Sequence, residues 1–99
     1  DRAVDFTEAI RRVPGDARHH YNRGLAYDAK GSLDLSIADY DAAIRLRPEF
    51  AAAFFNRAQA LKASGQTQRA IIDYRRALAL APKLRVVITE QLKQLDAAP

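Results

Sequence analysis

The sequence repeats with a period of 34 residues, and this period constrains the fold more than any other feature. Four positions carry the same or a similar residue three times at that interval: Asp5/Asp39/Asp73, Phe6/Tyr40/Tyr74, Ala9/Ala43/Ala77 and Pro14/Pro48/Pro82. Four more positions do so twice: Asn22/Asn56, Arg23/Arg57, Ala29/Ala63 and Gly31/Gly65. A fixed period in the range of about 20 to 50 residues is typical of proteins built from stacked copies of one small structural unit.

Each unit is predicted to be a pair of helices. Proline cannot continue a helix, and glycine suits the position just after a helix ends. These breaks predict four helices: Ala17–Lys30, Leu33–Arg47, Ala51–Ser64 and Thr67–Ala81. Apolar residues recur at helical spacing in the second helix of each pair, so one face of that helix is buried. In the first helices, Gly24 and Ala58 stand between larger residues and permit close approach of a neighbouring helix.

These residues resemble the tetratricopeptide signature of a small residue, a large residue, an aromatic residue, an alanine and a proline at fixed intervals. The residues that carry the resemblance are Gly24/Ala58, Tyr27/Leu61, Tyr40/Tyr74, Ala43/Ala77 and Pro48/Pro82, and the repeats are of an Asn-Arg-Gly type. Departures occur at His20, Ser36 and Leu61, where the family often has tryptophan, alanine and tyrosine. The resemblance covers nearly the whole chain. It implies an all-α, right-handed solenoid of antiparallel helix pairs, with a concave surface lined mainly by the first helix of each unit.

The chain is predicted to form one domain, residues 1–99, that starts in the middle of a repeat. Residues 1–16 match only a second helix, residues 17–50 and 51–84 form two full repeats, and residues 85–96 form a capping helix. Within that last helix the residues expected to face the stack are Val87, Ile88, Leu92 and Leu95. Phe6 and Ile10 are expected to lack part of their usual cover. Because the first residue is not methionine, we expect further sequence upstream.

Composition excludes several kinds of protein. The net charge of +4 comes from 16 basic and 12 acidic residues whose signs are interspersed, so no basic block indicates nucleic-acid binding. No run approaches the roughly 20 apolar residues of a membrane-spanning helix. The absence of cysteine excludes disulfides and leaves the localisation open.

No catalytic site is predicted. His19 and His20 are adjacent and so point about 100° apart on a helix, which prevents them from forming a paired metal site. No triad or nucleophile context surrounds Ser32, Ser36 or Ser64, and no glycine-rich phosphate loop is present. We therefore expect no enzymatic activity, metal or cofactor.

A ladder of ion pairs is predicted across the units. Arg23 and Arg57 each lie eight residues before a hairpin glycine, and Asp39 and Asp73 lie eight residues after it, so antiparallel helices bring them to one level. The same symmetry around the prolines sets Asp5 near Arg23 and Asp39 near Arg57. The alternative is that these arginines are exposed and have no fixed partner.

The family geometry implies a peptide-binding groove along the first helices. Its inward-facing residues would be Arg18, Tyr21, Asn22, Leu25 and Asp28, then Phe55, Asn56, Gln59 and Lys62, with Ala29, Ala52 and Ala63 beside them. Asparagine has low helix propensity, so Asn22 and Asn56 are not explained by propensity. Either they hydrogen-bond within the stack, or they grip a peptide backbone at points about three residues apart. In the second case, replacing both with alanine leaves the melting temperature nearly unchanged and weakens peptide binding by about 1–3 kcal/mol.

The predicted function is a protein-interaction module that binds a peptide or a partner protein segment in this groove. The alternative is self-association through the exposed N-terminal helix, with Phe6 and Ile10 in the contact. Some family members hold a partner's C-terminal carboxylate with a clamp of lysines, asparagines and an arginine. Here Ala52 and Asn56, or Val86 and Glu90, stand where that resemblance requires lysine and arginine, so we expect no such clamp.

Overall fold

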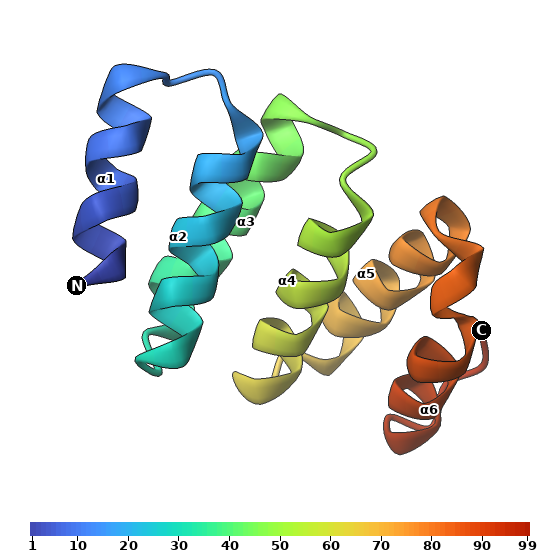
Figure 1. Ribbon diagram of the computed structural model, residues 1–99. Helices are drawn as coiled ribbons and strands as arrows, with labels where there is room; N and C mark the ends of the chain where they lie inside the picture. Colours follow the sequence, from blue (N-terminus) through green and yellow to red (C-terminus); the bar gives the residue numbers. More distant parts are fainter.

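The computed structural model describes residues 1–99 as six α-helices and one short 3₁₀ helix (Figure 1). Their bounds are α1 Arg2–Arg12, α2 Ala17–Ala29, α3 Leu33–Leu46, α4 Ala51–Ala63, α5 Thr67–Leu80, η1 Pro82–Leu84 and α6 Arg85–Gln94. The helices predicted from the sequence differ from these by one or two residues at their ends. None of the helices is both long and apolar enough to span a membrane.

The two hairpin turns close on glycine, as the sequence predicts. Gly31 and Gly65 have φ angles of 78° and 83°, in the left-handed region that glycine adopts without a steric penalty. The next amide then donates back into the helix, from Ser32 to the Tyr27 carbonyl at 2.9 Å. Such a bond satisfies a carbonyl that the helix end leaves free. The chain therefore reverses within a few residues, and each hairpin is antiparallel.

The helices form two layers. Figure 1 shows α2 and α4 side by side in front of α3 and α5, with α1 at the N-terminal edge and α6 at the C-terminal edge. The principal extents of 41 × 25 × 18 Å are those of a short solenoid. This arrangement confirms the predicted all-α solenoid of helix pairs.

Most of the core lies in the C-terminal half. One cluster of 12 buried residues runs from α3 to α6 and includes Tyr40, Tyr74 and Leu61. A second cluster of four, which contains Phe50, joins the two repeats. By contrast, Ala3 is the only buried residue of α1. The N-terminal helix is therefore held by much less apolar contact than the rest.

The C-terminal helix α6 covers the end of the larger core cluster. Ile88 and Leu92, one turn apart, are fully buried. Val87 was expected to face the stack, but 42% of its surface is exposed. It lies one residue, or about 100°, away from the Ile88–Leu92 stripe, which already fills the space against α5. The helix therefore packs through a narrower face than the sequence pattern indicated.

The small residue of the first helix has the role expected of it. A Cβ atom added at Gly24 would lie 2.6 Å from Cε1 of Tyr40. The Tyr40 ring thus packs directly on the backbone of α2. This close approach explains why position 24 is occupied by glycine.

Candidate functional site

Within each hairpin, one arginine binds one aspartate with two hydrogen bonds. The guanidinium of Arg23 donates to Asp39 at 2.7 and 2.8 Å, and that of Arg57 donates to Asp73 at 2.7 and 2.9 Å. The side chains of Asp39 and Asp73 are only 5% and 6% exposed. Hydrogen bonding to these carboxylates raises the pKa of both arginines. These charge-assisted hydrogen bonds therefore connect the two helices of each hairpin.

Each arginine also reaches the preceding unit, but not to the residue expected. Arg23 Nη1 donates to Thr7 Oγ1 at 3.0 Å, and Arg57 Nη1 donates to Asp41 Oδ1 at 2.8 Å. The expected partners were Asp5 and Asp39. Asp5 is exposed and makes no side-chain hydrogen bond to Arg23. A residue at its position faces the first helix of its own hairpin, whereas the residue two further on, about 200° around the helix, faces the next unit.

His20 joins the first ion pair. Its Nδ1 atom lies 3.3 Å from Asp39 Oδ1, and its side chain is 17% exposed. The histidine therefore packs within the first hairpin, beside the Arg23–Asp39 pair. No group of three or more histidine or acidic side chains is arranged to hold a metal ion.

Two of the predicted groove residues meet between α2 and α4. Asn56 Nδ2 donates to the Tyr21 hydroxyl at 2.9 Å and to the Ala52 carbonyl at 3.0 Å. The Tyr21 ring packs on Phe50, with 4.9 Å between ring centroids. Both amide protons of Asn56 are therefore used within the protein, and its Oδ1 acceptor has no partner there.

Three residues expected to set peptide specificity form hydrogen bonds to other helices of the domain. The buried Tyr40 hydroxyl donates to Asp28 at 2.5 Å, and the buried Tyr74 hydroxyl donates to Gln59. Burial raises the pKa of Tyr74 to about 12, so its hydroxyl keeps its proton at neutral pH. Lys62 donates to Gln91 and Gln94 at 2.7 and 2.5 Å, which joins α4 to α6.

A different part of the predicted groove remains free. Asn22 makes no side-chain hydrogen bond, and Leu25 is 37% exposed. Both line a small cavity of about 170 Å³ between α1 and α2, together with Phe6. Phe55 lies half-buried against Tyr74, with 5.9 Å between ring centroids. Arg18 lies at the start of α2, where its guanidinium binds Asp16.

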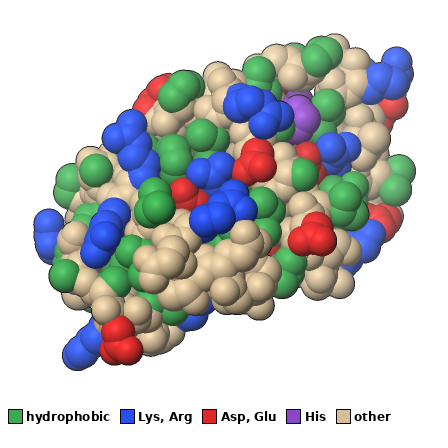
Figure 2. Space-filling model, turned by 180° about the vertical axis from the view of Figure 1, so that it is seen from behind, with side chains coloured by type: hydrophobic (Ala, Val, Ile, Leu, Met, Phe, Trp, Pro, Cys, Tyr) green, Lys and Arg blue, Asp and Glu red, His purple; other side chains and the backbone are tan.

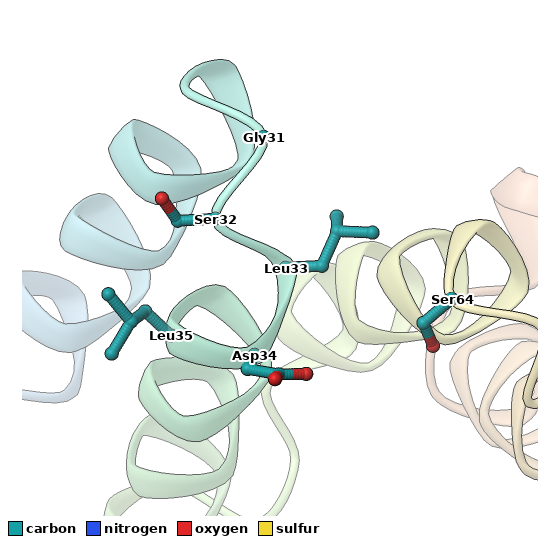
Figure 3. A pocket seen from close by; sticks show the side chains of 6 residues that line it. All are labelled: Gly31, Ser32, Leu33, Asp34, Leu35 and Ser64. Atoms are coloured by element: carbon teal, nitrogen blue, oxygen red, sulfur yellow. The ribbon is translucent and has the colours of Figure 1, made fainter.

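The hairpin turn after α2 contains a shallow depression of about 390 Å³ (Figure 3). It brings Ser32, Asp34 and Ser64 to one region of the surface. Their polar side chains point in different directions, and Leu33 and Leu35 point away from each other. The depression therefore offers no set of groups converging on one substrate atom.

A larger cavity, of about 600 Å³, lies between the α3–α4 turn and the α5–η1 turn. Sequence reasoning missed it. Its walls include Phe50 and Leu84, which follow Pro48 and Pro82 by two residues, whereas Asp16 follows Pro14. The change from aspartate to large apolar residues at one register position was the only signal of it in the sequence.

The rear of the molecule mixes charges of both signs. Figure 2 shows basic and acidic side chains close together on this face, with apolar side chains between them. This face therefore presents no broad basic surface.

The fold and its ion-paired hairpins define a helical-repeat solenoid of the kind used for protein interaction, and sequence comparison gives the family. Residues 29–65 match the family described as TPR repeat, and residues 51–84 match the one described as Tetratricopeptide repeat. The chain belongs to the tetratricopeptide repeat family. No curated protein sequence matches it significantly.

Solved structures share the fold at low sequence identity. The first TPR of Spaghetti (RPAP3), bound to the HSP90 peptide SRMEEVD, has a TM-score of 0.91 and 23% identity, over 95% of this chain and 74% of that chain. The Yersinia enterocolitica type III secretion chaperone SycD, in complex with a peptide of the translocator YopD, has a TM-score of 0.90 and 19% identity, over 95% and 76%. The Arabidopsis OM64 TPR domain has a TM-score of 0.86 and 23% identity, over 93% and 78%.

Proposed function

We propose that this domain is a non-catalytic binding module that holds an extended segment of a partner protein on the face formed by α2 and α4. The main support is a set of groups left without an internal partner on that face. Asn22 has its whole amide free, and Asn56 has a free acceptor oxygen. Leu25 and Phe55 provide apolar surface beside them. We name these four residues the α2–α4 surface.

The chemistry of this surface suits a peptide backbone. An amide side chain offers both a donor and an acceptor, which is what an extended backbone requires from its partner. Apolar contacts beside such bonds would supply most of the binding energy. Two structural neighbours, Spaghetti and SycD, are in complex with peptides, which supports the same general use for this domain.

We infer that the surface does not recognise a free C-terminal carboxylate. Ala52 and Val86 stand where a clamp would need lysine, and Asn56 already uses both of its amide protons. The peptide SRMEEVD, which is bound in the Spaghetti structure, provides the test. The free-acid and C-terminally amidated forms should bind with similar affinity. A gain of about tenfold or more for the free acid, or about 1.4 kcal/mol, would contradict this inference.

Selection from a displayed library of random peptides tests the proposal without a known partner. We expect enriched peptides whose binding is weakened about tenfold or more by Leu25→Glu, because a buried charge disrupts an apolar contact. Ile72→Glu is the matched control, since Ile72 is 64% exposed on the rear helix α5. Binding that is lost equally in both variants, or a library that yields no binder, would rule the proposal out.

The N-terminal helix keeps an exposed side, but nothing in the fold or the comparisons supports self-association. Val4 is 64% exposed, and Phe6 and Ile10 are half-buried. We therefore place the binding function on α2 and α4 rather than on a contact between copies of the chain.

A further inference from the structure

We propose that the edge of the solenoid carries a second docking site, which takes an apolar side chain flanked by carboxylates from a partner protein. The site is the 600 Å³ cavity between the α3–α4 turn and the α5–η1 turn. Both turns lie along the upper edge in Figure 1. This site goes beyond the proposed function, because it lies at the turns and not on the α2–α4 surface.

The cavity has an apolar wall. Phe50 and Ala51 contribute from the first turn, and Leu80, Pro82 and Leu84 contribute from the second. Its volume falls within the range of about 300–1,000 Å³ that is typical of small-molecule sites, so one or two large side chains can enter it. Burying a leucine or phenylalanine there removes apolar surface from water, which favours binding.

The charged residues that line the cavity are two cations, Arg47 and Lys83, and one acid, Glu49. Two further cations, Arg45 and Arg85, lie two residues from these in the chain but outside the cavity lining. All four cations are exposed, and none forms an ion pair or donates a hydrogen bond within the protein.

The α1–α2 turn is built differently. Arg11 and Arg12 bind Glu8 there, and Arg18 binds Asp16. The four cavities of the domain include none between that turn and the α3–α4 turn. The unpaired cations and the cavity therefore occur together at one junction only, although the repeats share the same fold.

One of these cations is already held in place over the wall. The guanidinium carbon of Arg47 lies 4.4 Å from the centroid of the Phe50 ring. A stacked guanidinium keeps its N–H groups at its edge, where they can bind a carboxylate. Such stacking reduces the entropy lost when an acidic group binds. The geometry thus places a carboxylate partner directly beside the apolar wall.

The same geometry argues for a protein segment over a nucleic acid. Single-stranded nucleic acids are held by aromatic faces on which bases stack. The only aromatic ring in this wall is Phe50, which is 8% exposed and is covered by Arg47. Carboxylates on either side of a leucine or phenylalanine match both the unpaired cations and the apolar wall.

The first experiment measures binding of the peptide acetyl-Glu-Glu-Leu-Phe-Glu-Glu-amide by fluorescence anisotropy at low salt. The double variant Arg47→Glu, Lys83→Glu should weaken binding by about tenfold or more. The control Arg2→Glu, Lys93→Glu makes the same change in net charge at two other exposed cations that have no partner. It should leave the affinity nearly unchanged. Equal weakening by both double variants would overturn the proposal, because the binding would then reflect net charge alone.

The second experiment separates this site from general anion binding. A peptide with Ser-Ser in place of Leu-Phe keeps the charge and removes the apolar side chains. It should bind at least about tenfold more weakly than the Leu-Phe peptide. Equal affinity would overturn the proposal. An oligothymidylate that binds more tightly than the Leu-Phe peptide, and competes with it, would assign the edge to nucleic acid and overturn it as well. Both double variants change exposed residues, so circular dichroism should show an unchanged fold.

Discussion

The two full repeats share one scaffold, but equivalent polar residues have different roles in them. Asn22 and Asn56 occupy the same register position in α2 and α4. Asn56 donates to Tyr21 on the preceding first helix, whereas Asn22 has no such helix beside it and keeps its amide free. A residue at a repeated position is therefore structural or available depending on its neighbour, and the position alone does not decide which.

The scaffold itself is the same in both repeats. A buried tyrosine packs against a small residue, Tyr40 against Gly24 and Tyr74 at the position opposite Ala58, and an arginine pairs with an aspartate within the hairpin. The size of the surrounding core differs, since most buried residues lie from α3 to α6. The following substitutions test how far the repeats are equivalent.

The largest difference is expected at the repeated aromatic position. Tyr74 is fully buried in the larger cluster, so Tyr74→Ala should lower the free energy of unfolding by about 3–5 kcal/mol. Phe6 is half-buried on a helix with little cover, so Phe6→Ala should cost about 1–2 kcal/mol. Urea denaturation followed by circular dichroism measures both. Similar losses in the two variants would mean that the N-terminal helix belongs to the same cooperative core.

In the ion-pair ladder, the contact within a hairpin should contribute more to stability than the contact between units, and this difference should be smaller than that at the aromatic position. Asp73→Ala leaves a partly buried arginine without its bidentate partner, and should cost about 2–3 kcal/mol. Asp41 is 35% exposed on its side chain and makes one bond to Arg57, so Asp41→Ala should cost less than about 1 kcal/mol. Urea denaturation measures both losses. A larger loss for Asp41→Ala than for Asp73→Ala would mean that the contact between units contributes more to stability than the contact within the hairpin.

At the small-residue position, opposite substitutions in the two repeats should both lower the stability, for different reasons. Gly24→Ala gains helix propensity but forces the Tyr40 ring to move, with a net loss of about 1–2 kcal/mol. Ala58→Gly should lose about 1 kcal/mol through propensity alone. Thermal denaturation of both variants provides the measurement. A stabilised Gly24→Ala protein would show that the ring has room to shift.

The asparagines should give the smallest effect and the sharpest comparison. Asn56→Ala removes the bond to Tyr21 and should cost about 1 kcal/mol of stability. Asn22→Ala removes no bond, so its melting temperature should be unchanged. This revises the expectation that both residues can be replaced without loss of stability. Equal melting temperatures for the two single variants would restore it.

The fold was predictable because its signals are local and repeated. The prolines and hairpin glycines, with apolar residues at helical spacing between them, locate the helices to within a residue or two. The place of Asp5 was not predictable from symmetry around Pro14. Its direction depends on the rotation of α1, and Thr7 faces Arg23 instead.

The candidate site was harder to predict, because several of its residues form hydrogen bonds to residues far along the chain. The sequence pattern places the polar residues Asp28 and Gln59 in the groove, but they accept hydrogen bonds from Tyr40 and Tyr74 of the second helices. Lys62 is bound by α6 in the same way. The edge cavity depends on two turns 34 residues apart, so no single stretch of sequence shows it.

The central claim is that the α2–α4 surface binds a partner segment, and nuclear magnetic resonance tests it most directly. A peptide selected from the displayed library would be titrated into the ¹⁵N-labelled domain. We predict the largest shifts at the side-chain amide of Asn22 and at the backbone amides of Leu25 and Phe55, with Ile72 on α5 unaffected. Shifts centred on α3 and α5, with those three residues unchanged, would contradict the account.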